Sequence, residues 1–147
     1  MKNNNPLLAA ASYRVVLKPL SFLRRSEQVD DENVRRLAAT ISAEDIWTSP
    51  LPVERDTGII MDGNHRICAA SLLGLAFAPC VLLDYRDPRV SVRHWQSDDP
   101  FDIVHIYRAI LEEHRILPHK TTRHSFAPAL PQTRINLRLL RTGDGIR

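Results

Sequence analysis

Hydrophobic residues recur along this chain with the spacing of helices in some stretches and of strands in others. A helix is predicted to begin at Asp30 or Asp31, because either carboxylate can accept hydrogen bonds from the first N–H groups of a helix. Its apolar face follows the i, i+3, i+4, i+7 pattern and consists of Val34, Leu37, Ala38 and Ile41. A later helix is predicted to start with Pro100 just inside it and to end near Arg115. Its inward face is expected to hold Ile103, Val104, Tyr107, Ile110, Leu111 and His114.

Short apolar runs bounded by turn residues predict the strands. These runs cover 13–17, 51–54, 59–61, 79–84 and 90–95, and a final strand can form at 134–139. The run at 59–61 leads into a further helix, from about His65 to Leu73, which Gly74 ends with a left-handed cap. The residues expected on the buried side of this helix are Cys68, Ala69, Leu72 and Leu73. Strands and helices in no regular repeat predict a compact mixed α+β domain, with a small mixed sheet and flanking helices.

The composition is that of one globular domain. The chain has 147 residues, of which 44% are hydrophobic and 25% are charged. We expect a flexible leader at 1–12, one folded domain at 13–141 and a flexible tail at 142–147. The longest apolar runs, such as 77–83, are too short to cross a membrane and the start lacks a signal-peptide pattern, so a cytoplasmic location is expected. Cys68 and Cys80 have neither a metal-binding nor a disulfide spacing and are interpreted as buried small apolar residues.

Charge is distributed unevenly along the chain. After Arg115 the sequence is rich in Lys and Arg and holds one acidic residue, Asp144. Such a segment can bind nucleic acid or a small phosphorylated ligand, or can simply be solvated. Composition does not separate these readings. The six histidines do not form a compact zinc-binding spacing.

The most informative stretch is 59–66, Ile-Ile-Met-Asp-Gly-Asn-His-Arg, in which a buried run leads through a turn to a helix start. A helix start presents unpaired N–H groups and a positive dipole end, which favour phosphate. His65 and Arg66 add side-chain donors, and the fork of Arg66 could grip two phosphate oxygens. Asp62 is placed to hold a divalent cation or to orient His65. Alternatively, Asp62 only caps the helix, Gly63 makes the turn, and the other two are ordinary polar residues.

The stretch 61–66, followed by Ala69-Ala70, Leu72-Leu73 and Gly74, resembles the signature of the ParB/sulfiredoxin-like superfamily. In that superfamily the stretch forms the phosphate site for a nucleotide. From about Val15 to Leu140 the chain resembles the free L-serine kinases, including siderophore-pathway and archaeal-type members, which make O-phospho-L-serine from serine and a nucleotide. The further motifs are Pro19-Leu20 leading to 26–30, Val-Ser-Val-Arg-His-Trp at 90–95, and above all Leu-Pro-His-Lys-Thr-Thr-Arg-His at 117–124.

The resemblance implies a role for each matching residue. Glu27 would be the catalytic carboxylate that takes the proton of the serine hydroxyl, with Asp62 and His65 beside the transferring phosphoryl group. The nucleotide phosphates would be bound by Asp62, Gly63, Asn64, His65 and Arg66, with Arg123 facing either the phosphates or the surface. Asp62 would hold Mg²⁺. The amino acid would be bound by Trp95, Lys120, Thr122 and His124.

The chain is therefore expected to be an enzyme, a phosphotransferase that moves the terminal phosphoryl group of ATP or ADP to the hydroxyl of L-serine with the help of Mg²⁺. Asn64 departs from the pattern, because His often occupies its position in these kinases. A non-catalytic regulator that senses nucleotide or phosphoserine is the alternative from a different class. A ParB-like DNA-binding protein is less favoured, because no helix-turn-helix pattern follows the motif. Sulfiredoxin chemistry is disfavoured because Asn64 stands where the reactive cysteine would be.

Overall fold

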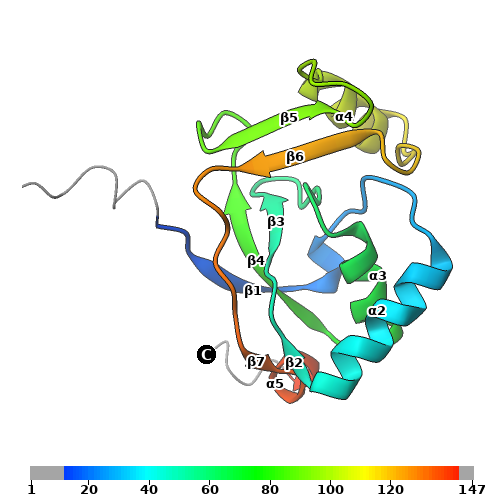
Figure 1. Ribbon diagram of the computed structural model, residues 1–147, viewed down its shortest axis with the longest axis vertical. Helices are drawn as coiled ribbons and strands as arrows, with labels where there is room; N and C mark the ends of the chain where they lie inside the picture. The colour runs from blue at the N-terminus through cyan, green and yellow to red at the C-terminus, as the bar shows by residue number, and fades with distance from the viewer. Residues whose placement is uncertain (1–11, 143–147) are drawn as a thin grey trace, which may run out of the picture.

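The computed structural model describes residues 12–142 as a mixed α+β fold (Figure 1). The predicted leader and tail lie outside the described residues, except for Ser12 and Thr142. The strands are β1 (Val15–Pro19), β2 (Ile46–Trp47), β3 (Leu51–Glu54), β4 (Phe77–Leu83), β5 (Val90–His94), β6 (Thr122–Phe126) and β7 (Ile135–Asn136). The helices are the 3₁₀ turn η1 (Leu20–Phe22), α2 (Asp31–Glu44), α3 (Asn64–Leu72), α4 (Ile103–Tyr107), the π-helical turn η2 (Arg108–Glu112) and α5 (Leu137–Thr142).

A three-stranded mixed sheet forms the centre of the fold. Its order is β1-β4-β3, with β4 antiparallel to β1 and parallel to β3. The hairpin-like pair β5-β6 lies at one end of the molecule beside α4, and the short pair β2-β7 lies with α5 at the other end (Figure 1). The predicted α+β class with a small mixed sheet and flanking helices is confirmed.

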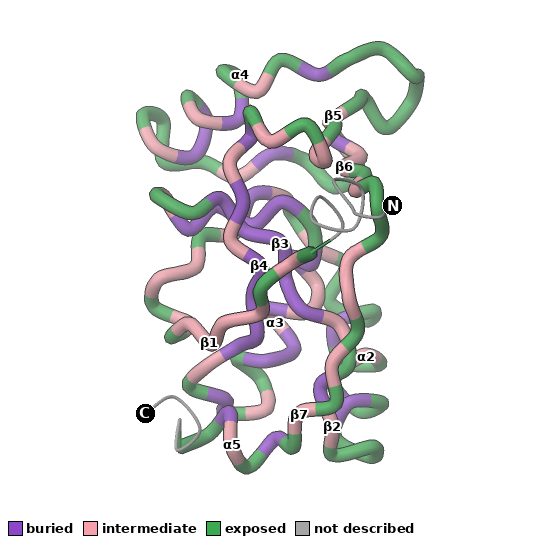
Figure 2. The backbone as a smooth tube through the Cα atoms, turned by 90° about the vertical axis from the view of Figure 1, so that its left-hand side faces the viewer, coloured by how far each residue is buried: buried purple, intermediate pink, exposed green. Residues whose placement is uncertain are grey.

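Two hydrophobic clusters meet along β4. The first joins the sheet to α2, α3 and α5, and includes Trp47, Leu51, Ala78 and Cys80. The second joins the sheet to α4 and the β5-β6 pair, and includes Val81, Leu83, Ile106 and Leu117. The burial trace shows the buried residues concentrated along β3 and β4 between these layers (Figure 2). Because both clusters use β4, this strand fixes the two layers relative to each other.

Helix α2 begins where the sequence predicts. The Asp30 carboxylate accepts hydrogen bonds from the N–H groups of Glu32 and Asn33 at 3.0 and 3.5 Å, so Asp30 is the N-cap. Asp45 adopts a left-handed conformation with φ 58° and ends the helix. Of the predicted inward face, Val34, Ala38 and Ile41 are buried and Leu37 is partly exposed.

Three other predicted elements differ in the structure. Residues 59–61 form isolated bridges, Arg24 with Ile59 and Val53 with Ile60, rather than a strand. The segment 134–139 pairs through only two residues before Asn136 caps the amide of Arg138 at 2.8 Å and begins α5. The last part of the polar run 119–124, to which no strand was assigned, forms the start of β6 at 122–124, because its backbone pairs with β5.

The later helix starts after Asp102, rather than beside Pro100. Phe101 still donates its N–H to the carbonyl of Val92 at 3.0 Å, so strand pairing continues to this point, and Asp102 then caps the amide of Val104 at 3.0 Å. The helix becomes a π-helical turn at Arg108. Val104, which was expected to be buried, is 52% exposed, while Ile106, Ala109 and Ile110 are buried.

Helix α3 buries only part of the side predicted: Ala69 is buried, and Cys68 and Leu73 are half-buried. Ile67, Ala69 and Ala70 are buried, because α3 is covered by α2 as well as by the sheet, whereas Leu72 is 61% exposed. Gly74 adopts the left-handed conformation predicted for it, with φ 73°. Cys80 is buried, which raises the pKa of its thiol to about 12, and Cys68 is only half-buried. No helix within residues 12–142 is both long and apolar enough to cross a membrane.

The turn that precedes the 59–61 segment is closed by a buried carboxylate and a glycine. One oxygen of Glu54 accepts the N–H groups of Asp56 and Thr57 at 3.0 and 2.8 Å, together with the hydroxyl of Thr57 at 2.7 Å. Gly58 follows with φ 77°, and a Cβ there would lie 2.0 Å from the carbonyl oxygen of Phe22. This contact requires glycine at position 58.

Replacing Gly58 with alanine should lower the free energy of unfolding by about 2–4 kcal/mol, because both the backbone conformation and the Phe22 contact oppose a side chain. Gly74→Ala is the matched control, since φ is again positive but no atom lies within 4 Å of the added Cβ. We expect the control to lose about 1 kcal/mol. Urea unfolding of both variants measures the difference, and equal losses would contradict the steric explanation.

Candidate functional site

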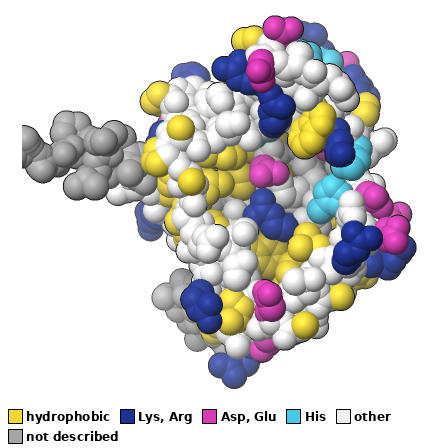
Figure 3. Space-filling model, in the orientation of Figure 1, with side chains coloured by type: hydrophobic (Ala, Val, Ile, Leu, Met, Phe, Trp, Pro, Cys, Tyr) yellow, Lys and Arg dark blue, Asp and Glu magenta, His cyan; other side chains and the backbone are white. Residues whose placement is uncertain are grey.

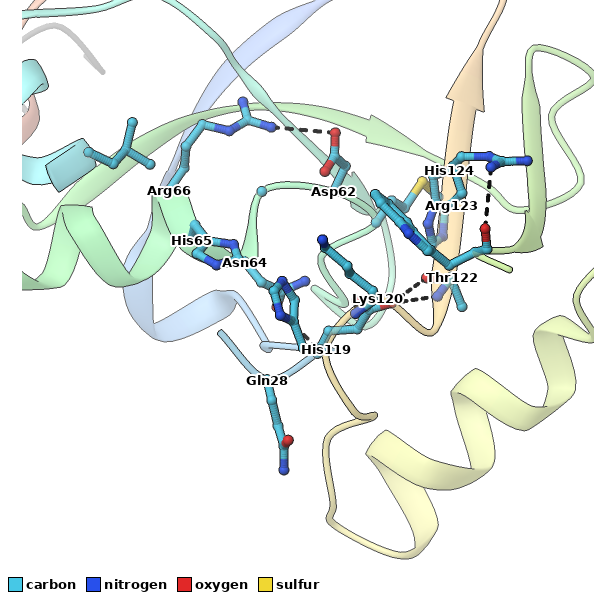
Figure 4. A pocket seen from close by; sticks show the side chains of 15 residues that line it. Gln28, Asp62, Asn64, His65, Arg66, His119, Lys120, Thr122, Arg123 and His124 are labelled. Atoms are coloured by element: carbon cyan, nitrogen blue, oxygen red, sulfur yellow. Dashed lines mark hydrogen bonds and ion pairs between the residues drawn. The ribbon is translucent and has the colours of Figure 1, made fainter. Parts of the chain in front are cut away.

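A cavity of about 560 Å³ lies between the start of α3, the segment after Arg25 and the segment that leads into β6. Its wall contains every residue that the sequence predicts for the site: Glu27, Asp62, Gly63, Asn64, His65, Arg66, Trp95, Lys120, Thr122, Arg123 and His124. Gln28, Leu37, Met61 and His119 also line it. Figure 4 shows the α3 residues on one side and Lys120 to His124 on the other. The fold thus brings together residues that are far apart in the sequence.

Gly63 shapes the side of the cavity at the start of α3. Its φ is 108°, and a Cβ would lie 2.4 Å from a methyl group of Leu51. Helix α3 has no side-chain N-cap, and its first backbone hydrogen bond runs from the Ile67 N–H to the Gly63 carbonyl at 2.9 Å. The preceding amides therefore stay open for an anion at the helix start.

Arg66 is held more firmly than the sequence suggests. One of its terminal nitrogens donates to the carbonyl groups of Ser49 and Pro50 at 2.9 and 3.1 Å, and the other lies 3.7 Å from the Asp62 carboxylate. Burial lowers the pKa of Arg66, and Asp62 partly offsets this effect. A two-pronged grip on phosphate through both terminal nitrogens is not open to this arrangement, because one of them already binds the backbone. Arg66 anchors the 49–50 turn and pairs with Asp62 on the same side of the cavity (Figure 4).

His65 is held as a neutral hydrogen-bond acceptor. Its Nε2 accepts the N–H of Asp30 at 3.1 Å, which links the start of α3 to the start of α2. Burial and the neighbouring His119, whose ring centre is 5.3 Å away, lower the pKa of His65. With Nε2 accepting, a proton on the neutral ring resides on Nδ1.

The side chain of Asn64 is turned toward the protein interior. It is 9% exposed, and its carbonyl oxygen accepts the N–H groups of Ser26 and Glu27 at 2.8 and 3.3 Å. Its amide nitrogen donates to the Ser26 hydroxyl at 3.0 Å. The side chain of Asn64 thus binds the protein itself, and its backbone belongs to the helix start.

The carboxylate of Glu27 lines the cavity and binds the segment 120–122. One carboxylate oxygen accepts the N–H of Lys120 at 3.1 Å, and the other accepts the N–H and the hydroxyl of Thr122 at 2.9 and 2.6 Å. The backbone beside it is also paired, since Leu117 donates its N–H to Ser26 and accepts that of Gln28, both at 2.8 Å. Glu27 therefore shapes the segment that leads into β6.

Lys120 and Trp95 form the outer edge of the cavity. Lys120 has φ 61°, and its Nζ lies 5.6 Å from the centre of the Trp95 ring, which is 40% exposed. The backbone N–H of Trp95 donates to the carbonyl of Thr121 at 3.1 Å. Arg123 is turned toward Asp98, with 2.6 Å between guanidinium and carboxylate, which favours the surface role over the phosphate role.

His124 lies deeper, beneath this edge. Its Nε2 is 2.9 Å from the hydroxyl oxygen of Tyr85. Burial lowers the pKa of His124 to about 4 and raises the pKa of Tyr85. At neutral pH the imidazole is uncharged, so this part of the wall adds hydrogen-bonding groups without adding charge.

A metal ion would have few protein ligands here. Within residues 12–142 there is no group of three His, Cys, Asp or Glu side chains arranged to hold an ion. Asp62 is 63% exposed at its side chain and can offer one carboxylate. Mg²⁺ commonly takes one or two carboxylates, with phosphate oxygens and water completing its shell. The donor set therefore fits an ion that is coordinated mainly by nucleotide phosphates and water, and it does not fit an ion coordinated by protein side chains alone.

The surface around the cavity combines histidine with charged side chains. Figure 3 shows them on the right-hand side of the face drawn, beside a hollow between the β5-β6 layer and the helices. Three polar contributors that lie within the motifs were not predicted as site residues: Ser26 and Gln28, within the 26–30 motif, and His119, within the 117–124 motif. Tyr85, the partner of His124, stands outside all the motifs, and no sequence signal identifies it.

Comparison with known proteins gives distant sequence relatives. No protein-family model matches the chain. It is similar to a ParB-like protein from Sulfolobus acidocaldarius, with 36% identity over 55 residues that cover 37% of this chain and 28% of that protein. It is also similar to an ATP-dependent L-serine kinase from Desulfurococcus mucosus, with 31% identity over 84 residues that cover 54% of this chain and 33% of that protein. The matched part of the chain spans about a third of the length of these curated relatives.

Solved structures match over most of the chain. A glutamate-to-alanine variant of a free serine kinase in complex with AMP has a TM-score of 0.77 at 13% identity, covering 87% of this chain and 94% of that chain. The free serine kinase itself with AMP gives 0.72 at 14%, covering 87% and 94%. C-terminally truncated SbnI from Staphylococcus aureus gives 0.70 at 14%, covering 88% and 90%. The chain thus shares the fold of free serine kinases and SbnI, which confirms the fold that the resemblance implied.

The low pKa of His124 makes stability depend on pH. The folded state keeps this imidazole neutral down to about pH 4, whereas the unfolded chain protonates it near its ordinary value, so its contribution is present at neutral pH and is lost as the pH falls. From about pH 7 to pH 5 we expect a loss of about 1–2 kcal/mol in the free energy of unfolding, reduced from the full linkage value because the side chain is partly exposed.

Urea unfolding of the wild type and of His124→Gln at both pH values isolates this effect from the titration of carboxylates. The variant retains a hydrogen-bonding side chain beside Tyr85 but has no imidazole to protonate. The same pH dependence in both proteins would contradict the assignment to His124.

Proposed function

We propose that this chain is a phosphotransferase that moves the terminal phosphoryl group of an adenine nucleotide, ATP or ADP, to the hydroxyl group of free L-serine. The observation that carries the proposal is the position of Glu27 within the cavity. Glu27 lies between an open helix start, suited to phosphate, and the Lys120–His124 segment, suited to a small zwitterion. The shared fold with free serine kinases and the distant likeness to an ATP-dependent L-serine kinase support the same assignment.

The nucleotide phosphates would lie at the start of α3. The open amides beyond Gly63 and the positive end of the helix dipole favour negative charge there. His65 would lie beside the transferring group, and Asp62 would hold Mg²⁺ together with phosphate oxygens. When bound, that ion would supply charge neutralisation for the phosphates.

Serine would lie against the opposite wall. The ammonium group of Lys120 is suited to the serine carboxylate, and Trp95 closes the outer side of the cavity. Thr122 and His124 add hydrogen-bonding groups that carry no charge at neutral pH. This arrangement would place the serine hydroxyl between Glu27 and the phosphates.

In the proposed reaction, the serine oxygen forms a bond to the terminal phosphorus while the bond from that phosphorus to the bridging oxygen of the nucleotide breaks. The hydroxyl proton passes to Glu27. A carboxylate has about four acceptor positions, and Glu27 uses three of them for Lys120 and Thr122, so one acceptor position is left for the hydroxyl. Those three hydrogen bonds fix the direction of the remaining position, which favours in-line alignment.

The same three hydrogen bonds also favour a second candidate, a non-catalytic module that senses nucleotide or phosphoserine. A sensor needs the phosphate pocket and a well-ordered substrate segment, and a Glu27 that only braces this segment satisfies both needs. The two functions differ in whether Glu27 must accept a proton. Product formation therefore distinguishes them.

Purified protein incubated with Mg²⁺, L-serine and either ATP or ADP should form O-phosphoserine, observed as a new ³¹P NMR signal. Glu27→Gln should lower the rate by about 10²–10⁴-fold, the usual contribution of a general base. Asp62→Ala should also lower the rate, by weakening the hold on Mg²⁺. Glu32→Gln is the control, because Glu32 lies on the exposed start of α2 and pairs with Arg36. Nucleotide binding by wild-type protein without any product would favour the sensor.

Removing the charge of Lys120 should affect serine and not the nucleotide. Lys120→Met keeps the length of the side chain, and we expect the KM for serine to rise by about 10–100-fold, the value of a charge-assisted hydrogen bond. Lys18→Met is the matched control, since Lys18 lies on β1 over the ring of Phe22 and outside the cavity. Steady-state kinetics and calorimetric titration with ADP provide the two readouts. An unchanged KM for serine would remove Lys120 from the serine site.

A further inference from the structure

Ser26 and Asn64 form a buried polar pair beneath the cavity. They are 5% and 9% exposed, and they are separated by 38 positions in the sequence. Ser26 belongs to the segment before α2, and Asn64 is the first residue of α3. Buried polar side chains are costly unless their hydrogen bonds are made. In this pair each polar side-chain atom makes at least one hydrogen bond.

The direction of each hydrogen bond in the pair is determined. The Ser26 hydroxyl donates its one proton to the carbonyl of Ile60 at 2.6 Å, so it can only accept from Asn64. The amide nitrogen of Asn64 must therefore face that hydroxyl, which leaves its carbonyl oxygen to accept the N–H groups of Ser26 and Glu27. A carboxylate at position 64 could accept both N–H groups but could not donate to Ser26.

The hydrogen bonds continue from this pair to the opposite wall of the cavity. Asn64 holds the backbone N–H of Glu27, and the carboxylate of Glu27 holds Lys120 and Thr122. A continuous series of contacts thus runs from the first residue of α3 to the start of β6. Figure 4 shows Asn64 on one side of the cavity, and Lys120 and Thr122 on the other.

We propose that Asn64 and Ser26 are positioning residues that set the separation between the phosphate side of the cavity and the segment 120–122. They act through Glu27, whose backbone they fix, and they touch neither the nucleotide nor serine with their side chains. This role differs from the phosphate contact that the resemblance implied for the Asn64 side chain. The kinetic part of the inference rests on the proposed kinase function, whereas the structural coupling does not.

Two variants test the coupling. Ser26→Ala removes the hydroxyl, and Asn64→Asp removes the donor while keeping an acceptor of the same shape. In both, the N–H groups of Lys120 and Thr122 should exchange with solvent about tenfold faster than in wild type, because the Glu27 carboxylate is less firmly placed. NMR hydrogen exchange measures this in the protein without any ligand, so the result does not depend on enzymatic activity.

Ile41→Val is the matched control for a general loss of stability. Ile41 is buried on α2 in the first hydrophobic cluster, and its apolar side chain forms none of the hydrogen bonds of the series. This change should lower global stability by about 1 kcal/mol without a selective effect on Lys120 and Thr122. Equal acceleration of these two amides in Ile41→Val, or no acceleration in Ser26→Ala and Asn64→Asp, would overturn the inference.

The kinetic readout separates positioning from binding. In both variants kcat should fall by about tenfold or more while the Kd for ADP stays within about twofold of wild type, because the α3 amides are still present. Weaker binding of ADP with an unchanged kcat would instead indicate that Asn64 contacts the phosphates, and it would overturn the positioning role. If wild type forms no phosphoserine, hydrogen exchange and ADP binding still decide the inference, and only the kinase proposal fails.

Discussion

The site depends on how one short extended segment, 24–28, is held between two others. On one side Arg24 donates its N–H to the Gly58 carbonyl at 2.8 Å and accepts that of Ile60 at 2.9 Å. On the other side Ser26 and Gln28 exchange hydrogen bonds with Leu117. The segment thus acts as a strand without being part of a sheet. Because its two edges pair with segments that are far apart in the sequence, 58–60 and Leu117, its backbone hydrogen bonds join these segments at the cavity.

Hydrogen bonds and ion pairs within the protein determine which polar side chains of the cavity remain available to a ligand. Arg66 is bound to backbone carbonyls, Arg123 to Asp98, and His65 to the amide of Asp30. The ammonium group of Lys120 contacts an aromatic ring instead, because its Nζ lies over the ring of Trp95. The candidate site therefore offers fewer cationic side chains to a ligand than the number of basic residues in its motifs suggests. Directed amides and a few neutral hydrogen-bonding side chains provide much of its polarity.

The sequence predicts the local features of this structure better than the distant ones. The Asp30 cap, the turn at Gly63 and the left-handed Gly74 follow from the properties of single residues and are present. Strand β6 was not predicted, because its residues are polar and its formation depends on pairing with β5. The binding of Arg66 to Ser49 and Pro50 could not be predicted either, since a guanidinium fits backbone carbonyls as well as phosphate. The motifs selected residues that line one cavity, but the use of each side chain was set by tertiary partners.

The two hydrophobic clusters that meet along β4 divide the cavity into halves with separate supports. Helix α3 packs in the first cluster, whereas β5, β6 and Leu117 pack with the second. Substitutions that reshape one half need not disturb the packing beneath the other. In evolutionary terms the packing is modular: a lineage could alter the surface of β5 and β6 that lines the cavity while inheriting the packing beneath the start of α3 intact.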